Sequence, residues 1–85
     1  MSGSDKASAL QVIKDKIEEV LQVDPHRIDT EVPLSVYGID SAFMAMILDD
    51  LEDHFSHRFP TDVLEGNPSA DELASRVVAE YSASA

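Results

Sequence analysis

Cysteine is absent from this sequence of 85 residues. Its absence excludes a disulfide framework and a zinc-thiolate site, and it excludes thiol chemistry performed by a side chain. Any reaction that passes through a thiol would therefore require a cofactor that brings the thiol with it.

A long apolar segment is also absent. No stretch approaches the roughly 20 apolar residues that span a bilayer, and the segment from Met1 to Ser8 lacks the charged and apolar regions of a signal peptide. We therefore expect a cytoplasmic protein that does not enter a membrane.

Basic residues are scarce: six lysines and arginines stand against seventeen aspartates and glutamates, for a formal net charge of −11. Such a surface repels nucleic acid phosphates and anionic membranes, so neither is an expected partner. It attracts a protein with a basic patch through long-range steering. The simpler alternative is that the charge only keeps a small domain soluble.

The short length predicts one monomeric domain over residues 5–82, with flexible ends at residues 1–4 and 83–85. A domain of this size buries only about 60% of the surface of its unfolded chain. Enclosing a catalytic site in so small a core is difficult. We therefore expect a role in binding or presenting a molecule, and no enzyme activity.

Apolar residues recur at three- and four-residue steps in three segments, which is the pattern of amphipathic helices. The first runs from about Asp5 to Gln22 and cannot pass Asp24, because Pro25 disfavours a helical residue before it. The second starts with Asp40 or Ser41 as N-cap and runs to about His54 or Ser56. The third starts at a Ser69–Glu72 capping box. The side chains expected to face inward are Leu10, Ile13, Ile17, Val20 and Leu21 in the first helix, Met44, Ile47, Leu48, Leu51 and Phe55 in the second, and Leu73, Ala74, Val77 and Tyr81 in the third.

The segments between these helices differ in kind. Residues 25–40 show no sustained periodicity and predict a long ordered loop, which is an uncommon and usually functional feature. Pro60-Thr61 opens a short helical turn that Gly66 closes. No strand-length window alternates in the way a strand requires. The predicted fold is therefore all-α: a small four-helix bundle of three main helices and one short helix, with the long loop between helices 1 and 2.

The long loop ends in Tyr37-Gly38-Ile39-Asp40-Ser41, where the second helix is expected to begin. This arrangement places a hydroxyl beside a carboxylate at the positive end of a helix. Unpaired backbone N–H groups and the helix dipole favour a phosphate there. An isolated Asp-Ser pair is nevertheless explained more simply as a helix cap.

The segment Gly38-Ile39-Asp40-Ser41 resembles the attachment motif of acyl carrier proteins, which is commonly Gly-Xaa-Asp-Ser-Leu. Pro33-Leu34 and Leu51-Glu52 extend the resemblance over nearly the whole domain. The segment from Pro60 to Leu64 and on through Asn67-Pro68-Ser69 is most similar to carriers of polyketide synthases, although carriers of fatty acid synthases and peptide synthetases remain alternatives.

The resemblance implies a function for this segment. Ser41, with Asp40 beside it, would receive a 4'-phosphopantetheine arm from coenzyme A, and the chain would carry acyl intermediates as thioesters in polyketide biosynthesis. The implied partners are a phosphopantetheinyl transferase and synthase enzymes such as acyltransferase and ketosynthase domains.

Two departures from the family concern the partner surface. Ala42 stands where the family usually has leucine. Outside the core stripe of the same helix lie the apolar residues Phe43, Ala45 and Met46, beside the acidic residues Asp49, Asp50 and Asp53. We expect a partner-binding strip with an apolar centre and a steering acidic rim, unless Phe43 or Met46 packs against the preceding loop or the short helix.

Other hypotheses account for less of the sequence. His54 and His57 have no evident third ligand, and the acidic residues of the second helix lack a calcium-loop motif, so no metal site is expected. A serine hydrolase would need Gly-Xaa-Ser-Xaa-Gly, which is absent. The main alternative is a non-enzymatic acidic interaction module that binds a basic protein, with Ser41 only a helix cap.

Overall fold

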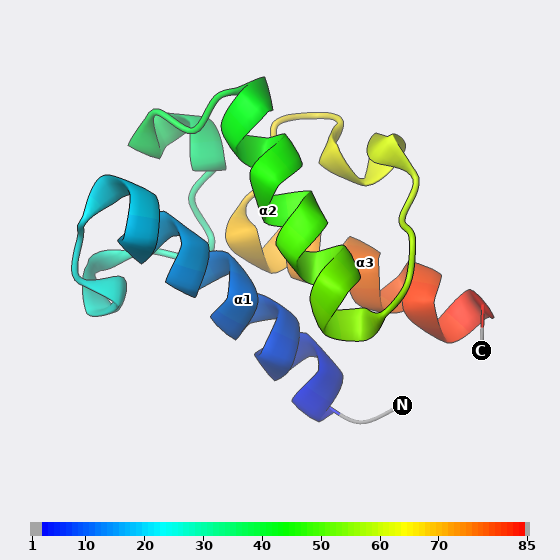
Figure 1. The fold of residues 1–85 in the computed structure, drawn as a ribbon. Helices are drawn as coiled ribbons and strands as arrows, with labels where there is room; N and C mark the ends of the chain where they lie inside the picture. Colours follow the sequence, from blue (N-terminus) through cyan, green and yellow to red (C-terminus); the bar gives the residue numbers. More distant parts are fainter. Residues whose placement is uncertain (1–2, 85) are drawn as a thin grey trace.

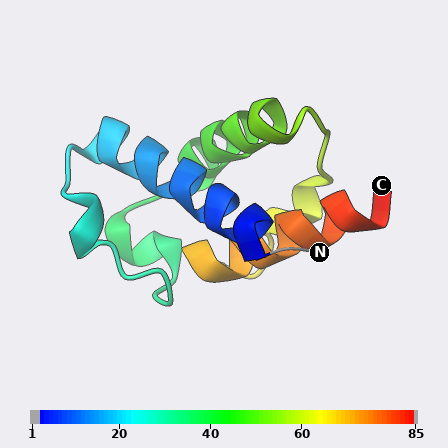
Figure 2. The same ribbon diagram turned by 90° about the horizontal axis from the view of Figure 1, so that it is seen from below.

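A computed structural model describes residues 3–84, and within this range the chain is helical without a strand. The three amphipathic segments form α1 (Gly3–Leu21), α2 (Ser41–Phe55) and α3 (Ala70–Ser84). Between them lie the 3₁₀ turns η1 (Pro25–Arg27), η2 (Leu34–Tyr37) and η3 (Thr61–Leu64). Helix α1 packs against both α2 and α3 (Figures 1 and 2). The predicted all-α fold is confirmed.

Helix boundaries at the two ends differ from those expected from the sequence. Gly3 and Ser4 belong to α1, and Met1 and Ser2 lie outside the described residues. Helix α3 continues to Ser84, and Ala85 lies outside the described residues. The carboxyl end of α1 comes at Leu21, because Gln22 adopts a left-handed conformation (φ 56°) and donates its N–H to the carbonyl of Glu18 at 2.8 Å.

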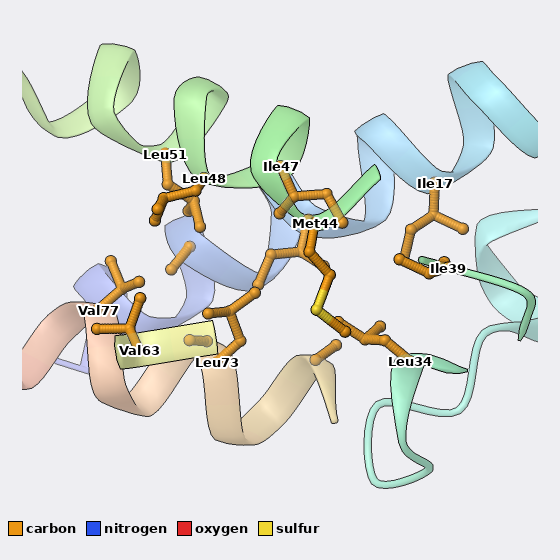
Figure 3. Close-up of a cluster of buried hydrophobic side chains, with 14 of the residues drawn as sticks. Ile17, Leu34, Ile39, Met44, Ile47, Leu48, Leu51, Val63, Leu73 and Val77 are labelled. Carbon is orange, nitrogen blue, oxygen red and sulfur yellow. The ribbon is translucent and has the colours of Figure 1, made fainter. Parts of the chain in front are cut away.

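The hydrophobic core collects side chains from all three α-helices and from the connections between them (Figure 3). The predicted stripe of α2 is confirmed at Met44, Ile47, Leu48 and Leu51, which are buried. The other buried apolar side chains among the described residues are Ala9, Ile13, Ile17, Ile28, Leu34, Ile39, Phe43, Phe59, Val63, Pro68, Ala70, Leu73, Ala74, Val77 and Val78.

Some residues expected to face inward lie at the margin of the core. Leu10, Leu21, Phe55 and Tyr81 are only partly buried, although all four pack against the core. The prediction for Val20 was wrong, because its side chain is 42% exposed. The last turn of α1 extends past α2 and α3 toward η1 (Figures 1 and 2), so its side chains are less covered.

The long loop between α1 and α2 is ordered, as predicted, and it is held against the start of α3. Leu34 is fully buried, and its backbone N–H donates to the carbonyl of Pro68 at 3.0 Å. The N–H of Asp71 donates to the carbonyl of Thr30 at 2.8 Å. These bonds could not be expected from local patterns, because they join residues 34 and 41 positions apart in the sequence.

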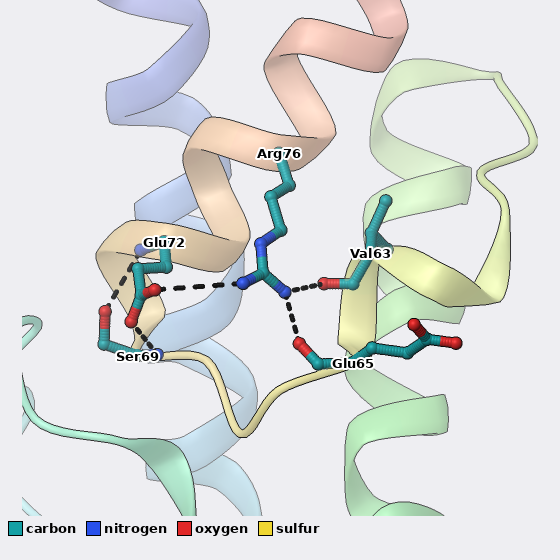
Figure 4. Close-up of polar contacts among 5 residues, drawn as sticks. All are labelled: Val63, Glu65, Ser69, Glu72 and Arg76. Atoms are coloured by element: carbon teal, nitrogen blue, oxygen red, sulfur yellow. Dashed lines mark hydrogen bonds and ion pairs between the residues drawn. The ribbon is translucent and has the colours of Figure 1, made fainter.

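The amino end of α3 carries the predicted capping box (Figure 4). The hydroxyl of Ser69 accepts the N–H of Glu72 at 3.1 Å, and the carboxylate of Glu72 accepts the N–H of Ser69 at 3.2 Å. Each side chain therefore satisfies a backbone donor of the other residue at the helix start.

Arg76 holds the short turn η3 against α3 (Figure 4). Its guanidinium donates to the carbonyl of Val63 at 3.0 Å and also to the carbonyl of Glu65. A second nitrogen lies 3.8 Å from the carboxylate of Glu72. Two carbonyls of the α2–α3 connection are thus fixed by one side chain that α3 supplies, and Glu72 of α3 itself holds that side chain in place.

Candidate functional site

The approach of the chain to α2 is fixed by a glycine followed by a buried side chain. Gly38 ends η2 in a left-handed conformation (φ 81°), which glycine adopts without steric cost. No atom lies within 4 Å of the position that a Cβ would take there, so backbone conformation and not space requires glycine. The next residue, Ile39, is buried, and the two residues after it, Asp40 and Ser41, are exposed at the start of α2.

Asp40 is the residue that caps α2. Its carboxylate accepts the N–H of Phe43 at 2.9 Å, while its backbone carbonyl accepts the N–H of Met44 at 2.9 Å. Ser41 is the first residue of the helix and takes no part in the cap. The hypothesis that Ser41 serves only as the helix cap therefore conflicts with the structure.

The surroundings of the Ser41 side chain suit an attached phosphate. The side chain is exposed, and the first turn of α2 contains no acidic residue. By their position, the first backbone N–H groups of a helix have no acceptor within it, and the helix dipole is positive at this end. The neighbouring Ala42 is small and exposed, so the hydroxyl is open to an approaching enzyme.

An exposed stripe of α2 starts at Ser41. Side chains four residues apart lie on one face of a helix, which places Ser41 in line with Ala45 and Asp49. Asp53 continues this line, and Ala42 and Met46, which are four residues apart, flank it. All six of these residues are exposed, and Met46 is 44% exposed. The residues predicted for the partner surface are therefore together, with two exceptions.

Phe43 is the first exception. Its side chain is only 8% exposed and belongs to the core, so the expected apolar strip lacks it. Phe43 immediately precedes Met44 on the buried face of α2, and its N–H is the one that Asp40 caps. The structure thus buries Phe43, which the sequence had left open as the alternative to exposure.

Asp50 is the second exception. Its carboxylate lies 3.1 Å from the ammonium of Lys16 on α1, which also contacts Glu19 at 2.7 Å. These two carboxylates raise the pKa of Lys16 through their hydrogen bonds. Asp50 therefore pairs with α1, whereas Asp49 and Asp53 have no ion pair among the described residues.

The two histidines of the α2 carboxyl end lie in an aromatic cluster. His54 meets Phe55 edge-on at 4.9 Å between ring centroids, and His57 lies 5.0 Å from Phe59 and 5.7 Å from Tyr81. Over residues 3–84, no group of three or more histidine or acidic side chains is placed to hold a metal ion. In the same part of the chain, every helix is too short or too polar to cross a bilayer.

Comparison with protein families gives one match. A family model described as a phosphopantetheine attachment site matches residues 11–77, which include the long loop, all of α2 and the start of α3. Comparisons with curated proteins and with solved structures give no match.

Proposed function

Because the chain belongs to the family of phosphopantetheine attachment domains, we propose that it is an acyl carrier protein of polyketide biosynthesis whose arm is attached to Oγ of Ser41. Domains of this family carry 4'-phosphopantetheine covalently and are not catalytic themselves. The arm supplies a terminal thiol that holds an acyl group as a thioester. This matches the composition of the chain, which has no thiol of its own.

The division of roles between Asp40 and Ser41 supports the choice of attachment residue. Asp40 satisfies the free N–H of Phe43, so the helix start is stable without the hydroxyl of Ser41. Ser41 then offers a hydroxyl at a fixed backbone position, beside N–H groups that favour a phosphodiester. The bond forms from Oγ to the phosphorus of the arm, and the adenosine bisphosphate part of coenzyme A leaves.

The contribution of this chain after modification is presentation. The loop before Ser41 is anchored at Leu34 and Ile39, both buried, so the base of the arm is held rigidly. A tethered substrate reaches a docked active site at an effective concentration of about millimolar, without binding that site tightly by itself. The carrier therefore needs only weak, rapidly exchanging contacts with each enzyme.

The test of the attachment site is intact mass after incubation with coenzyme A, Mg²⁺ and a broad-specificity phosphopantetheinyl transferase. We expect the wild type to gain the mass of one phosphopantetheine and Ser41→Ala to gain none. Ser75→Ala, which removes an exposed serine of α3, is the matched control and is expected to gain the same mass as the wild type. An unmodified wild type with several transferases would favour the interaction-module alternative.

The exposed stripe of α2 supports a docking surface with a defined set of residues. Ala42, Ala45 and Met46 provide a small apolar centre next to Ser41, and Asp49 and Asp53 provide unpaired charges beyond it. An enzyme with a basic rim would be steered to this face and released easily, because exposed rim charges change association rates more than affinity.

Charge neutralisation tests the docking surface. In low salt, we expect the double variant Asp49→Asn/Asp53→Asn to raise the KM of the transferase by roughly two- to fivefold, and the difference to vanish near 0.5 M salt. Asp50→Asn is the control, because Asp50 already pairs with Lys16. An equal effect of the control variant would show that the overall charge matters, and not this face.

The polyketide assignment rests on the similarity of the segment from Pro60 to Ser69. It can be tested by offering the loaded protein to malonyl-transferring enzymes of polyketide and fatty acid systems, with the carrier of each system as a reference. We expect a higher kcat/KM with the polyketide enzyme. Better transfer by the fatty acid enzyme would place the chain in fatty acid synthesis instead.

A further inference from the structure

The least expected surface residue is Val36, on the turn η2 before Ser41. Its side chain is 67% exposed, which exceeds the exposure of Met46 (44%), Val20 (42%) and Val23 (37%), the other large hydrophobic side chains that the described residues expose. Burial of valine favours folding, so this exposure contributes nothing to the stability of the domain. We propose that Val36 is an apolar contact for the phosphopantetheinyl transferase that modifies Ser41, an inference that rests on the proposed function.

The turn η2 holds Val36 in place. The N–H of Val36 donates to the carbonyl of Pro33 at 3.0 Å, and the N–H of Gly38 donates to the carbonyl of Ser35 at 3.0 Å. Leu34 and Tyr37, on either side, pack into or against the core. A stiff β-branched side chain on an ordered turn loses little conformational freedom when a partner covers it, which favours its use as a contact.

Val36 lies close enough to Ser41 for one enzyme to cover both. Five residue steps of at most about 3.6 Å limit the separation to roughly 18 Å. The helical turn and the left-handed Gly38 shorten it further. A typical stable interface covers about 800 Å² on each partner, which is a disc of roughly 16 Å radius. An enzyme centred on Ser41 therefore reaches η2 as well as the first turns of α2.

Among the expected partners, the transferase is the one best placed to make this contact. It has to reach Oγ of Ser41 directly, whereas enzymes that act later on the acyl group meet the far end of the arm. Ala42, directly beside Ser41, offers little apolar area for such an enzyme, and Val36 offers a larger apolar side chain on the loop side of the serine. The complementary surface is an apolar hollow with basic residues around it, because this chain carries a net charge of −11.

The test compares two exposed valines in steady-state loading by a phosphopantetheinyl transferase, with coenzyme A saturating. We expect Val36→Ser to raise the KM for the carrier about fivefold or more and to leave kcat within roughly twofold, since it removes binding and leaves the reacting hydroxyl unchanged. Val20→Ser is the matched control on α1 and is expected to behave as the wild type. Val36→Ile keeps an apolar side chain and is expected to retain the wild-type KM.

Each result has a distinct meaning. Equal KM values for Val36→Ser and Val20→Ser, with both variants melting as the wild type, would overturn the role of Val36 while the proposed function stands. A fall in kcat without a change in KM would also overturn it, because the substitution would then act through the position of Ser41. A wild type that is never loaded would refute the proposed function itself, and this contact with it.

Discussion

Two substitutions of Asp40 can distinguish the stability that its N-cap hydrogen bond contributes from the stability that its negative charge contributes. Asp40→Ala removes the acceptor that lies 2.9 Å from the N–H of Phe43, whereas Asp40→Asn keeps a good capping side chain and removes only the charge. Loss of an N-cap typically costs about 1 kcal/mol, within a range of roughly 0.5–2 kcal/mol. The attraction of a carboxylate to the helix dipole accounts for about 0.3–1 kcal/mol of stability in exposed positions such as this one.

These magnitudes predict an order among the variants. For a domain of this size, 1 kcal/mol corresponds to about 4–8 °C in Tm. We expect Asp40→Ala to lower Tm by roughly that amount and Asp40→Asn to lower it by less, because Asn is nearly as good an N-cap as Asp. Asp62→Ala is the control, because Asp62 is exposed on η3 and, among the described residues, nothing forms a hydrogen bond or ion pair with its carboxylate.

The assay is thermal unfolding followed by circular dichroism, together with the rate of transferase loading. Asp40→Ala is expected to load several-fold more slowly, because fraying of the first turn displaces Ser41, and Asp40→Asn is expected to load as the wild type. The reasoning would be refuted if Asp40→Ala melted with the wild type, or if Asp40→Asn lost as much stability as Asp40→Ala.

Two further predictions concern α1 and η2. The pKa of Lys16 lies above its ordinary value of 10.5 because of hydrogen bonds to Glu19 and Asp50, so this stabilisation is complete below about pH 10.5 and is lost as pH rises through the folded-state pKa. The Tm difference between wild type and Lys16→Met should therefore shrink above that pH, and a constant difference would contradict the prediction. Gly38→Ala should cost about 1–2 kcal/mol in urea unfolding through its positive φ alone, since no atom blocks a Cβ, and an unchanged midpoint would contradict this.

The helices and their caps were largely predictable because their signals are local. The three- and four-residue spacing of Ile13 and Ile17 and of the α2 stripe follows from helix geometry, and the Ser69–Glu72 box needs only residues three apart. The 3₁₀ turns within the long loop were not predicted. Their own hydrogen bonds are local, such as the bond from Val36 to Pro33, but the loop carries no periodic pattern that marks them, and the bond that anchors η2 joins Leu34 to the distant Pro68.

The candidate site was also only partly predictable from the sequence. Its position at the start of α2 was predicted, but two residues of the partner surface changed role. Burial of Phe43 depends on side chains from other segments that cover the first turn of α2, and the pairing of Asp50 depends on Lys16 from a different helix. The exposure of Val36 likewise depends on how η2 packs. None of these follows from a helical period.

By itself, the sequence determined that the chain is an all-helical, strongly acidic domain without a thiol, with an Asp-Ser pair where a long loop meets a helix. Helical period follows from the spacing of residues along the chain, and charge and composition follow from residue counts. All three can therefore be deduced before the fold is known. Only the tertiary structure decided that Phe43 is buried and that Asp50 pairs with Lys16, and therefore which side chains of α2 remain for a partner. Those outcomes depend on which distant segments pack together, because burial and ion pairing are set by neighbours in space.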